Sequence, residues 1–165
     1  SKAAVKISNT EVEQKSGSKE KSDVKAKRSN VKVIVNGKKV GFDAFAINGN
    51  NYFKLRDIAM ALNGSDKQFE VTWDSKAKAI SLKSNKKYTP VGGELTVTFK
   101  PAEVKAAITE SKILLDGKEI ALTAYNISGN NYFKLRDIGK ALNFGVVWNG
   151  ATSTIGIDTT SSYIE

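Results

Sequence analysis

The octapeptide Asn-Tyr-Phe-Lys-Leu-Arg-Asp-Ile occupies residues 51–58 and recurs unchanged at residues 131–138, an offset of 80 positions. The match extends outward without gaps, because residues 33–63 and 113–143 share 17 of 31 amino acids. An eight-residue identity inside a chain of 165 residues is not expected by chance. The sequence therefore predicts an internally duplicated unit.

The repeat continues beyond a short insertion in its first copy. Residues 64–68 have no counterpart, so the offset falls to 75, and residues 69–74 then match residues 144–149. Outside the repeats, the N-terminal segment is rich in Lys, Ser and Glu. The segment between the repeats has an alternating apolar pattern at residues 95–99. We predict a linker or weakly ordered arm at 1–30, a first repeat at 31–84, a connector with a candidate extra strand at 85–112, and a second repeat at 113–165.

Each repeat begins with the pattern of a β-hairpin. Residues 31–35 and 40–47 are apolar strand candidates, and the dipeptide Asn36-Gly37 between them suits a turn in which both central residues need positive φ. Asp116-Gly117 takes the same place in the second repeat.

A helix and a second hairpin follow in each repeat. The apolar residues after the Lys of the octapeptide have helical spacing: Leu55, Ile58, Ala59 and Leu62. Together the elements predict an α+β fold made of two tandem copies of a small antiparallel β-sheet curved around one α-helix. A unit this short buries only about 60% of its unfolded surface, so we expect the copies to pack together or share strands.

The composition removes most familiar active sites. The chain has no Cys and no His, which excludes disulfides, thiolate nucleophiles and the commonest general base and transition-metal ligand. No run of about 18 apolar residues is present to span a membrane. No catalytic constellation, metal site or cofactor motif is recognisable, so the sequence favours a protein that is not an enzyme.

The net charge of +9 is unevenly distributed. Residues 113–165 carry four basic and five acidic side chains, so the positive excess lies nearer the N-terminus. The basic residues are almost all Lys, whose compact ammonium lacks the planar fork that suits bidentate phosphate recognition. We expect diffuse attraction to polyanions and no specific nucleic-acid binding, with non-specific nucleic-acid binding as the weakest alternative function.

The octapeptide, followed by Trp73-Asp74 and a short return strand, resembles a known family. These are stalk domains similar to the N-terminal domain of copper amine oxidase, which occur in tandem in secreted and surface proteins of Gram-positive bacteria. The segment at residues 88–95 is similar to the one that joins such copies, and the resemblance covers residues 31–165. It implies a sheet curved around one helix, an extracellular or wall-associated location, and an accessory role beside other domains of a larger parent protein.

The resemblance does not extend to amine oxidase chemistry. In that family's enzymes the chemistry belongs to a separate catalytic domain with three His copper ligands and a Tyr that matures to a quinone in an Asn-Tyr-Asp/Glu context. Here His is absent, and Tyr52 and Tyr132 are each followed by Phe. Neither copper nor quinone is expected.

Repeated polar and aromatic residues of the octapeptide are candidate ligand-binding residues: Tyr52, Lys54, Arg56, Tyr132, Lys134 and Arg136. One interpretation is a cationic pocket beside a Tyr, suited to an anionic glycan or teichoic acid. We favour a structural interpretation, in which Asp57 offsets the partial positive charge of the helix N-terminus and Arg56 packs or forms an ion pair there.

Trp73 and Trp148 occupy the same position of the second hairpin and complete the candidate set. An exposed Trp could stack on a sugar ring. Because Phe69, Val71 and Trp73 alternate in phase, we instead expect the indoles to face the core.

The function that these features favour is a non-catalytic extracellular stalk or accessory module of a larger bacterial surface or secreted protein. The expected ligand is an anionic cell-wall polymer. The expected partners of the module are thus a cell-wall polymer, either teichoic acid or peptidoglycan, or other domains of the parent protein, and a monomer is favoured. The main alternative is a protein–protein interaction module that acts through exposed strand edges.

Overall fold

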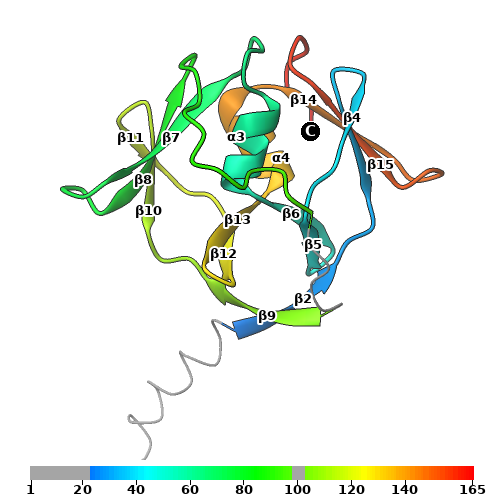
Figure 1. Ribbon diagram of the computed structural model, residues 1–165, viewed down its shortest axis with the longest axis horizontal. Helices are drawn as coiled ribbons and strands as arrows, with labels where there is room; N and C mark the ends of the chain where they lie inside the picture. Colours follow the sequence, from blue (N-terminus) through cyan, green and yellow to red (C-terminus); the bar gives the residue numbers. More distant parts are fainter. Residues whose placement is uncertain (1–22, 98–102) are drawn as a thin grey trace, which may run out of the picture.

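The computed structural model of the protein describes residues 23–97 and 103–165 (Figure 1). The fold is mostly β, with a closed six-stranded barrel at one end and a four-stranded sheet on either side. Two short helices lie between those sheets. We call residues 23–84 the N-terminal half and residues 103–165 the C-terminal half.

The barrel draws strands from both halves, and all of its neighbouring strands are antiparallel. Its strands, in order, are β12 (Ala124–Ile127), β13 (Asn130–Lys134), β6 (Asn50–Lys54), β5 (Ala44–Ile47), β2 (Asp23–Arg28) and β9 (Glu103–Ile108). Its interior is a packed cluster made of Ala26, Phe45, Ile47, Tyr52, Ala106, Tyr125, Ile127 and Tyr132. Adjacent residues on a strand face opposite ways. The repeated Tyr-Phe pair therefore sends its Tyr into the barrel and its Phe into the main core.

The two side sheets also combine both halves. One has the order β11 (Lys118–Ile120), β10 (Lys112–Leu115), β8 (Ala79–Ser84) and β7 (Phe69–Asp74). The other has the order β14 (Gly145–Asn149), β15 (Thr154–Asp158), β3 (Lys32–Val35) and β4 (Lys38–Val40). Each sheet joins a hairpin of one half to a hairpin of the other, and the joining pairs β10–β8 and β15–β3 are parallel.

This pairing changes the predicted architecture. A separate antiparallel sheet around one helix in each of two tandem copies is not confirmed, whereas the expectation that the repeats share strands is confirmed. A hairpin with strands of three or four residues is marginal alone. The β3–β4 and β10–β11 hairpins therefore gain most by adding to the long hairpin of the opposite half.

The helices are α3 (Leu55–Ala61) and α4 (Leu135–Leu142), and each begins directly after a barrel strand. Their apolar faces enter one shared core, as the helical spacing predicted: Leu55, Ile58, Ala59, Leu62, Leu135, Ile138 and Leu142.

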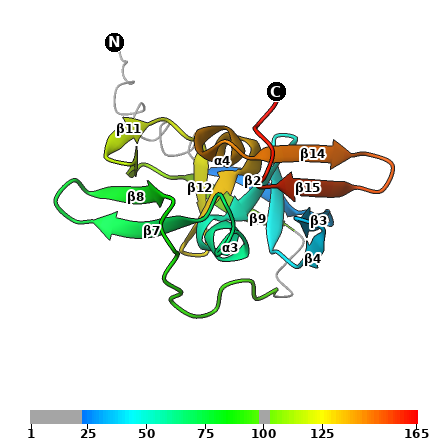
Figure 2. The ribbon, with the colours of Figure 1, turned by 90° about the horizontal axis from the view of Figure 1, so that it is seen from above.

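The strand registers relate the two halves by an approximate two-fold axis. Phe53 on β6 pairs with Phe133 on β13, and Lys25 on β2 pairs with Lys105 on β9. Both pairs join residues 80 positions apart on antiparallel strands, so an axis through them exchanges the halves. Seen from above in Figure 2, α3 and α4 lie on opposite sides of this axis.

The structure confirms the predicted turn of the first hairpin but divides one of its predicted strands. Asn36 and Gly37 have φ of 49° and 86°, as the predicted turn requires. The strand predicted at residues 40–47 is divided between β4 and β5, which belong to different sheets.

The outer boundaries of the repeats also differ from the prediction. β2 lies within residues 1–30, which we predicted to be a linker or weakly ordered arm, and residues 1–22 lie outside the described residues. The connector contains β9 at its C-terminal end. Residues 95–97 of the predicted strand at 95–99 are not a strand, because Leu95 adopts φ of 63°, and residues 98–99 lie outside the described residues.

Candidate functional site

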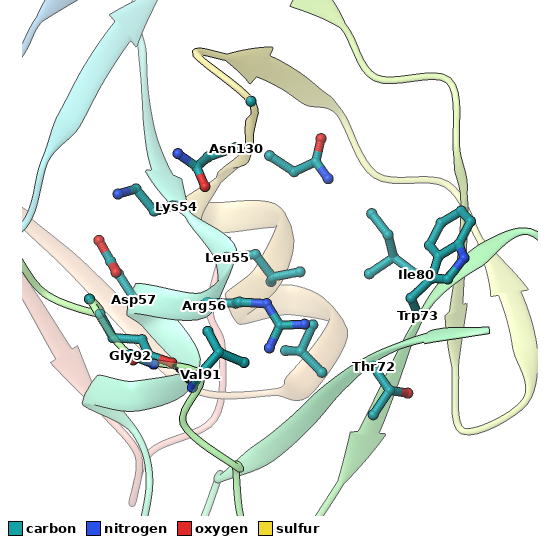
Figure 3. Close-up of a pocket in the computed structure, with 15 residues that line it drawn as sticks. Lys54, Leu55, Arg56, Asp57, Thr72, Trp73, Ile80, Val91, Gly92 and Asn130 are labelled. Carbon is teal, nitrogen blue, oxygen red and sulfur yellow. Dashed lines mark hydrogen bonds between the residues drawn. The ribbon is translucent and has the colours of Figure 1, made fainter. Parts of the chain in front are cut away.

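A cleft of about 300 Å³ opens beside the start of α3, and we call it the α3 cleft (Figure 3). Both halves of the chain line it. The N-terminal half contributes Lys54, Leu55, Arg56, Asp57, Val71, Thr72, Trp73 and Ile80. The connector adds residues 91–94, the turn between β12 and β13 adds Gly129, and the start of β13 adds Asn130 and Asn131.

Arg56 is directed into this cleft because β6 runs without a loop into α3. Lys54 is the extended N-cap residue of the helix, and Arg56 follows in its first turn. Arg56 Nη1 donates a hydrogen bond to the Tyr88 hydroxyl at 3.2 Å, and its guanidinium carbon lies 5.8 Å from the centroid of that ring. In Figure 3 the guanidinium points toward the side of the cleft that Trp73 forms.

The connector is fastened to the same place by a carboxylate of α3. Asp57 accepts a hydrogen bond from the Leu95 N–H at 2.9 Å, and its other oxygen has no hydrogen-bond partner among the described residues. Burial raises the pKa of Asp57 above its ordinary value, and the Leu95 hydrogen bond opposes this. The predicted role of Asp57 at the helix start is thus joined by a role in holding the connector.

Glu94 links residues of the connector to one another beside this attachment. It accepts hydrogen bonds from the Tyr88 hydroxyl at 2.6 Å and from the N–H groups of Val91 and Gly92 at 2.7 and 2.9 Å. Burial opposes ionisation, but these hydrogen bonds lower the pKa of Glu94 to about 2. The cleft lining therefore has two cationic and two carboxyl side chains, so it is not the strongly cationic pocket that one interpretation of the octapeptide suggested.

The prediction that the two Trp residues are buried in the core is wrong. Trp73 is 55% exposed and Trp148 is 46% exposed, whereas Phe69 and Val71 are buried. Trp73 does lie on the predicted side of its strand, because it pairs with Ile80, which is buried in the core. The β7–β8 hairpin projects away from α3 (Figure 1), so its end carries the indole beyond the helix that would cover it.

A second cleft lies at the equivalent place beside α4, and we call it the α4 cleft. It has a volume of about 340 Å³ and is lined by Gly49, Asn50, Asn51, Leu135, Arg136, Val146, Val147, Trp148 and Ile155. Each of these residues is the repeat counterpart of a residue in the α3 cleft. Connector residues 91–94 line the α3 cleft and do not line this one.

The predicted site residues are therefore separated. Lys54, Arg56 and Trp73 share the α3 cleft, and Arg136 and Trp148 share the α4 cleft, whereas Lys134 lines neither.

Tyr52 and Tyr132, predicted as aromatic neighbours of a pocket, are 3% and 0% exposed inside the barrel. A ligand at the surface does not reach them there. Burial is the main cause that raises the pKa of Tyr52 to about 12, and it also raises the pKa of Tyr132.

Sequence reasoning missed the residues that complete each cleft from elsewhere in the chain. Asn130 and Asn131 come from the half opposite to α3, and Tyr88, which accepts a hydrogen bond from Arg56 of the α3 cleft, comes from the connector. One signal for Tyr88 was present, because Tyr163 follows it by 75 positions, the offset of the second hairpin. The N–H of each Tyr donates to an Asn side chain after the helix, Asn63 or Asn143, at 3.0 Å.

A family model of the copper amine oxidase N-terminal domain matches residues 34–157, a span that contains both octapeptides and both clefts. The chain belongs to the copper amine oxidase N-terminal domain family. This family is a non-catalytic module of copper amine oxidases, as the resemblance of the octapeptide implied. Comparisons with curated proteins and with solved structures gave no match.

The residues of this family member do not fit the copper centre that the family name suggests. Protein copper sites use His imidazole and Cys or Met sulfur ligands, and the sequence has no His and no Cys. Within residues 23–97 and 103–165, no three or more His, Cys, Asp or Glu side chains lie together so that they could hold a metal ion. None of the helices in the described part of the chain has the length and apolar character needed to cross a bilayer.

Proposed function

We propose that this chain is a duplicated, non-catalytic accessory or stalk module of a larger Gram-positive surface or secreted protein, and that it binds a cell-wall polymer through the α3 cleft. The observation that carries the binding proposal is the half-exposed indole of Trp73 in a cleft that also contains Arg56 and the Asn130 and Asn131 side chains. Membership of a non-catalytic family supports the accessory role.

The chemistry of the cleft favours a sugar over a bare polyanion. An indole offers a flat apolar face that fits the C–H groups of a pyranose, and amide and guanidinium groups hydrogen-bond to hydroxyls. The two cationic side chains share the lining with two carboxyls, so the cleft itself adds little attraction for phosphate. The net charge of +9 adds a diffuse, salt-sensitive attraction to teichoic acid.

The strand-edge alternative stays a prediction. The outer strands β4 and β11 have three residues each and carry exposed Lys side chains, features that discourage the addition of a further strand. The opposite edges, β7 and β14, are longer, so they are where a partner strand would add.

The experiment is co-sedimentation of the full chain with isolated Gram-positive walls, with and without teichoic acid, at low and high salt. We expect retention that survives both teichoic acid removal and high salt, and that falls in Trp73→Ala. The matched control is Ile34→Ala, which shortens an exposed apolar side chain outside both clefts. Retention lost with teichoic acid, and equal in both variants, would assign binding to the lysines. Absence of retention at low salt would refute polymer binding.

A further inference from the structure

The two clefts repeat one arrangement of side chains. In each, an Arg from the first turn of a helix and a half-exposed Trp from the following hairpin belong to the same half of the chain. In each, the Asn-Asn pair comes from the other half. The residues that differ are those of the connector, which line only the α3 cleft.

The clefts face away from each other. They are related by the approximate two-fold axis through the Phe53–Phe133 and Lys25–Lys105 pairs. Figure 2 places α3 and β7 on one side of the molecule and α4 and β14 on the other. One extended ligand strand seated in the α3 cleft therefore does not continue into the α4 cleft.

The clefts are also fixed relative to each other. The strand pairs β13–β6, β2–β9, β10–β8 and β15–β3 join the halves into one hydrogen-bonded body, and both helices pack into one core. Neither cleft is complete in one half alone, since each needs the turn before β6 or β13 of the opposite half.

We propose that the α3 and α4 clefts are two separate sites for the same glycan ligand, so that one chain bridges two polymer strands. This inference rests on the proposed function, because it assigns a second site and a cross-linking role to the same chemistry. At the α4 cleft Trp148 packs against the sugar face and Arg136 hydrogen-bonds to its hydroxyls. Trp73 and Arg56 do the same at the α3 cleft.

Stoichiometry separates this proposal from simple binding. Isothermal titration of the full chain with a short fragment of peptidoglycan glycan, freed of its peptides, should give two sites per chain. Trp73→Ala and Trp148→Ala should each leave one site, and the double variant should leave none. Ile34→Ala should keep two sites, and thermal melting should show that every variant is folded. Arg136→Gln, at an exposed residue, should lower the glycan affinity of the α4 cleft without removing an aromatic side chain.

Bridging is then measured with long glycan strands of the same chemistry. Light scattering should rise with added wild-type chain and fall again at excess protein. Each single Trp variant should bind the strands and give at least a tenfold smaller rise. One site per wild-type chain, or loss of all binding in Trp73→Ala, would overturn bridging and leave the proposed function standing. No binding of glycan by the wild type would overturn both.

Discussion

The two halves of the molecule use the same octapeptide but differ in the contacts made at the start of the helix. At α3 the connector lies against the helix start, where Asp57 holds the Leu95 N–H and Tyr88 joins Arg56 to Glu94. At α4 the counterpart of Asp57, Asp137, accepts a long hydrogen bond from the Thr123 N–H at 3.4 Å. The repeated residues thus build the barrel strands and the helices, and the segments outside the repeat decide what each cleft exposes.

The barrel shows a second difference between the halves. In the N-terminal half Arg28 and the fully buried Asp43 form an ion pair with Nη1 and Oδ1 3.2 Å apart. Their counterparts 80 positions later are Ile108 and Thr123, which are both exposed. At equivalent positions of the fold, one half therefore has an ion pair and the other has two uncharged, exposed side chains.

The largest expected effect on stability comes from removing the buried carboxylate of this ion pair. Asp43→Ala leaves Arg28 without its buried partner, and we expect the free energy of unfolding to fall by about 3 kcal/mol. Thr123→Ala should change it by less than about 0.5 kcal/mol, since it is a surface substitution. Urea unfolding at pH 7 measures both values. The double variant Arg28→Ile with Asp43→Thr copies the C-terminal half and should recover most of the loss. Equal effects of Asp43→Ala and Thr123→Ala would show that the pair does not distinguish the halves.

The next effect concerns the two Tyr residues that follow the second hairpins. Tyr88→Phe removes a buried hydroxyl that joins a guanidinium to a carboxylate, so we expect a loss of about 2 kcal/mol. Tyr163→Phe should cost less than about 0.5 kcal/mol, because Tyr163 is only half-buried and its N–H, which the substitution keeps, makes the bond to Asn143. Thermal unfolding of the two variants side by side tests this, and similar losses would contradict it.

What the sequence could reveal follows from how local each feature is. The Asn36-Gly37 turn and the helical spacing from Leu55 to Leu62 depend on neighbouring residues, and both were predicted. The parallel β15–β3 pairing joins residues about 120 positions apart, and nothing in a strand pattern states which edge it meets.

The exposure of Trp73 could not be predicted for the same reason. Its alternation with Phe69 and Val71 gave the correct side of the strand. Exposure depends on how far the hairpin extends past α3, which only the tertiary packing sets. The burial of Tyr52 likewise required knowledge that β6 closes a barrel with the other half of the chain.

A smaller effect tests the contact between each helix and its following strand. Gly139 of α4 replaces Ala59 of α3, and a Cβ at Gly139 would lie 2.8 Å from Val146 Cγ2 and 3.3 Å from the Phe144 carbonyl oxygen. Gly139→Ala should therefore destabilise by about 1 kcal/mol, because overpacking outweighs the gain in helix propensity. Ala59→Gly should also destabilise, by about 1–2 kcal/mol, through helix propensity and a lost buried methyl group. Chemical denaturation of both variants is the measurement, and a stabilised Gly139→Ala variant would show that α4 and β14 have room for a Cβ, as α3 and β7 have for Ala59.

The smallest effect depends on pH and belongs to the connector alone. The pKa of Glu94 is about 2 in the folded chain, below the ordinary Glu value of 4.5. Its ionised form therefore stabilises the fold above about pH 4.5, and this contribution is lost as the pH falls toward 2.

Between pH 5 and pH 2.5 we expect the wild type to lose about 1 kcal/mol more stability than Glu94→Gln, a small value because solvent screens a half-exposed carboxylate. Asp57, whose pKa is raised by burial, contributes in the opposite direction, and comparing the two proteins at each pH removes its contribution. Parallel curves of stability against pH for wild type and Glu94→Gln would mean that ionised Glu94 does not stabilise the connector. The difference between the starts of α3 and α4 would then rest on Asp57 and Tyr88 alone.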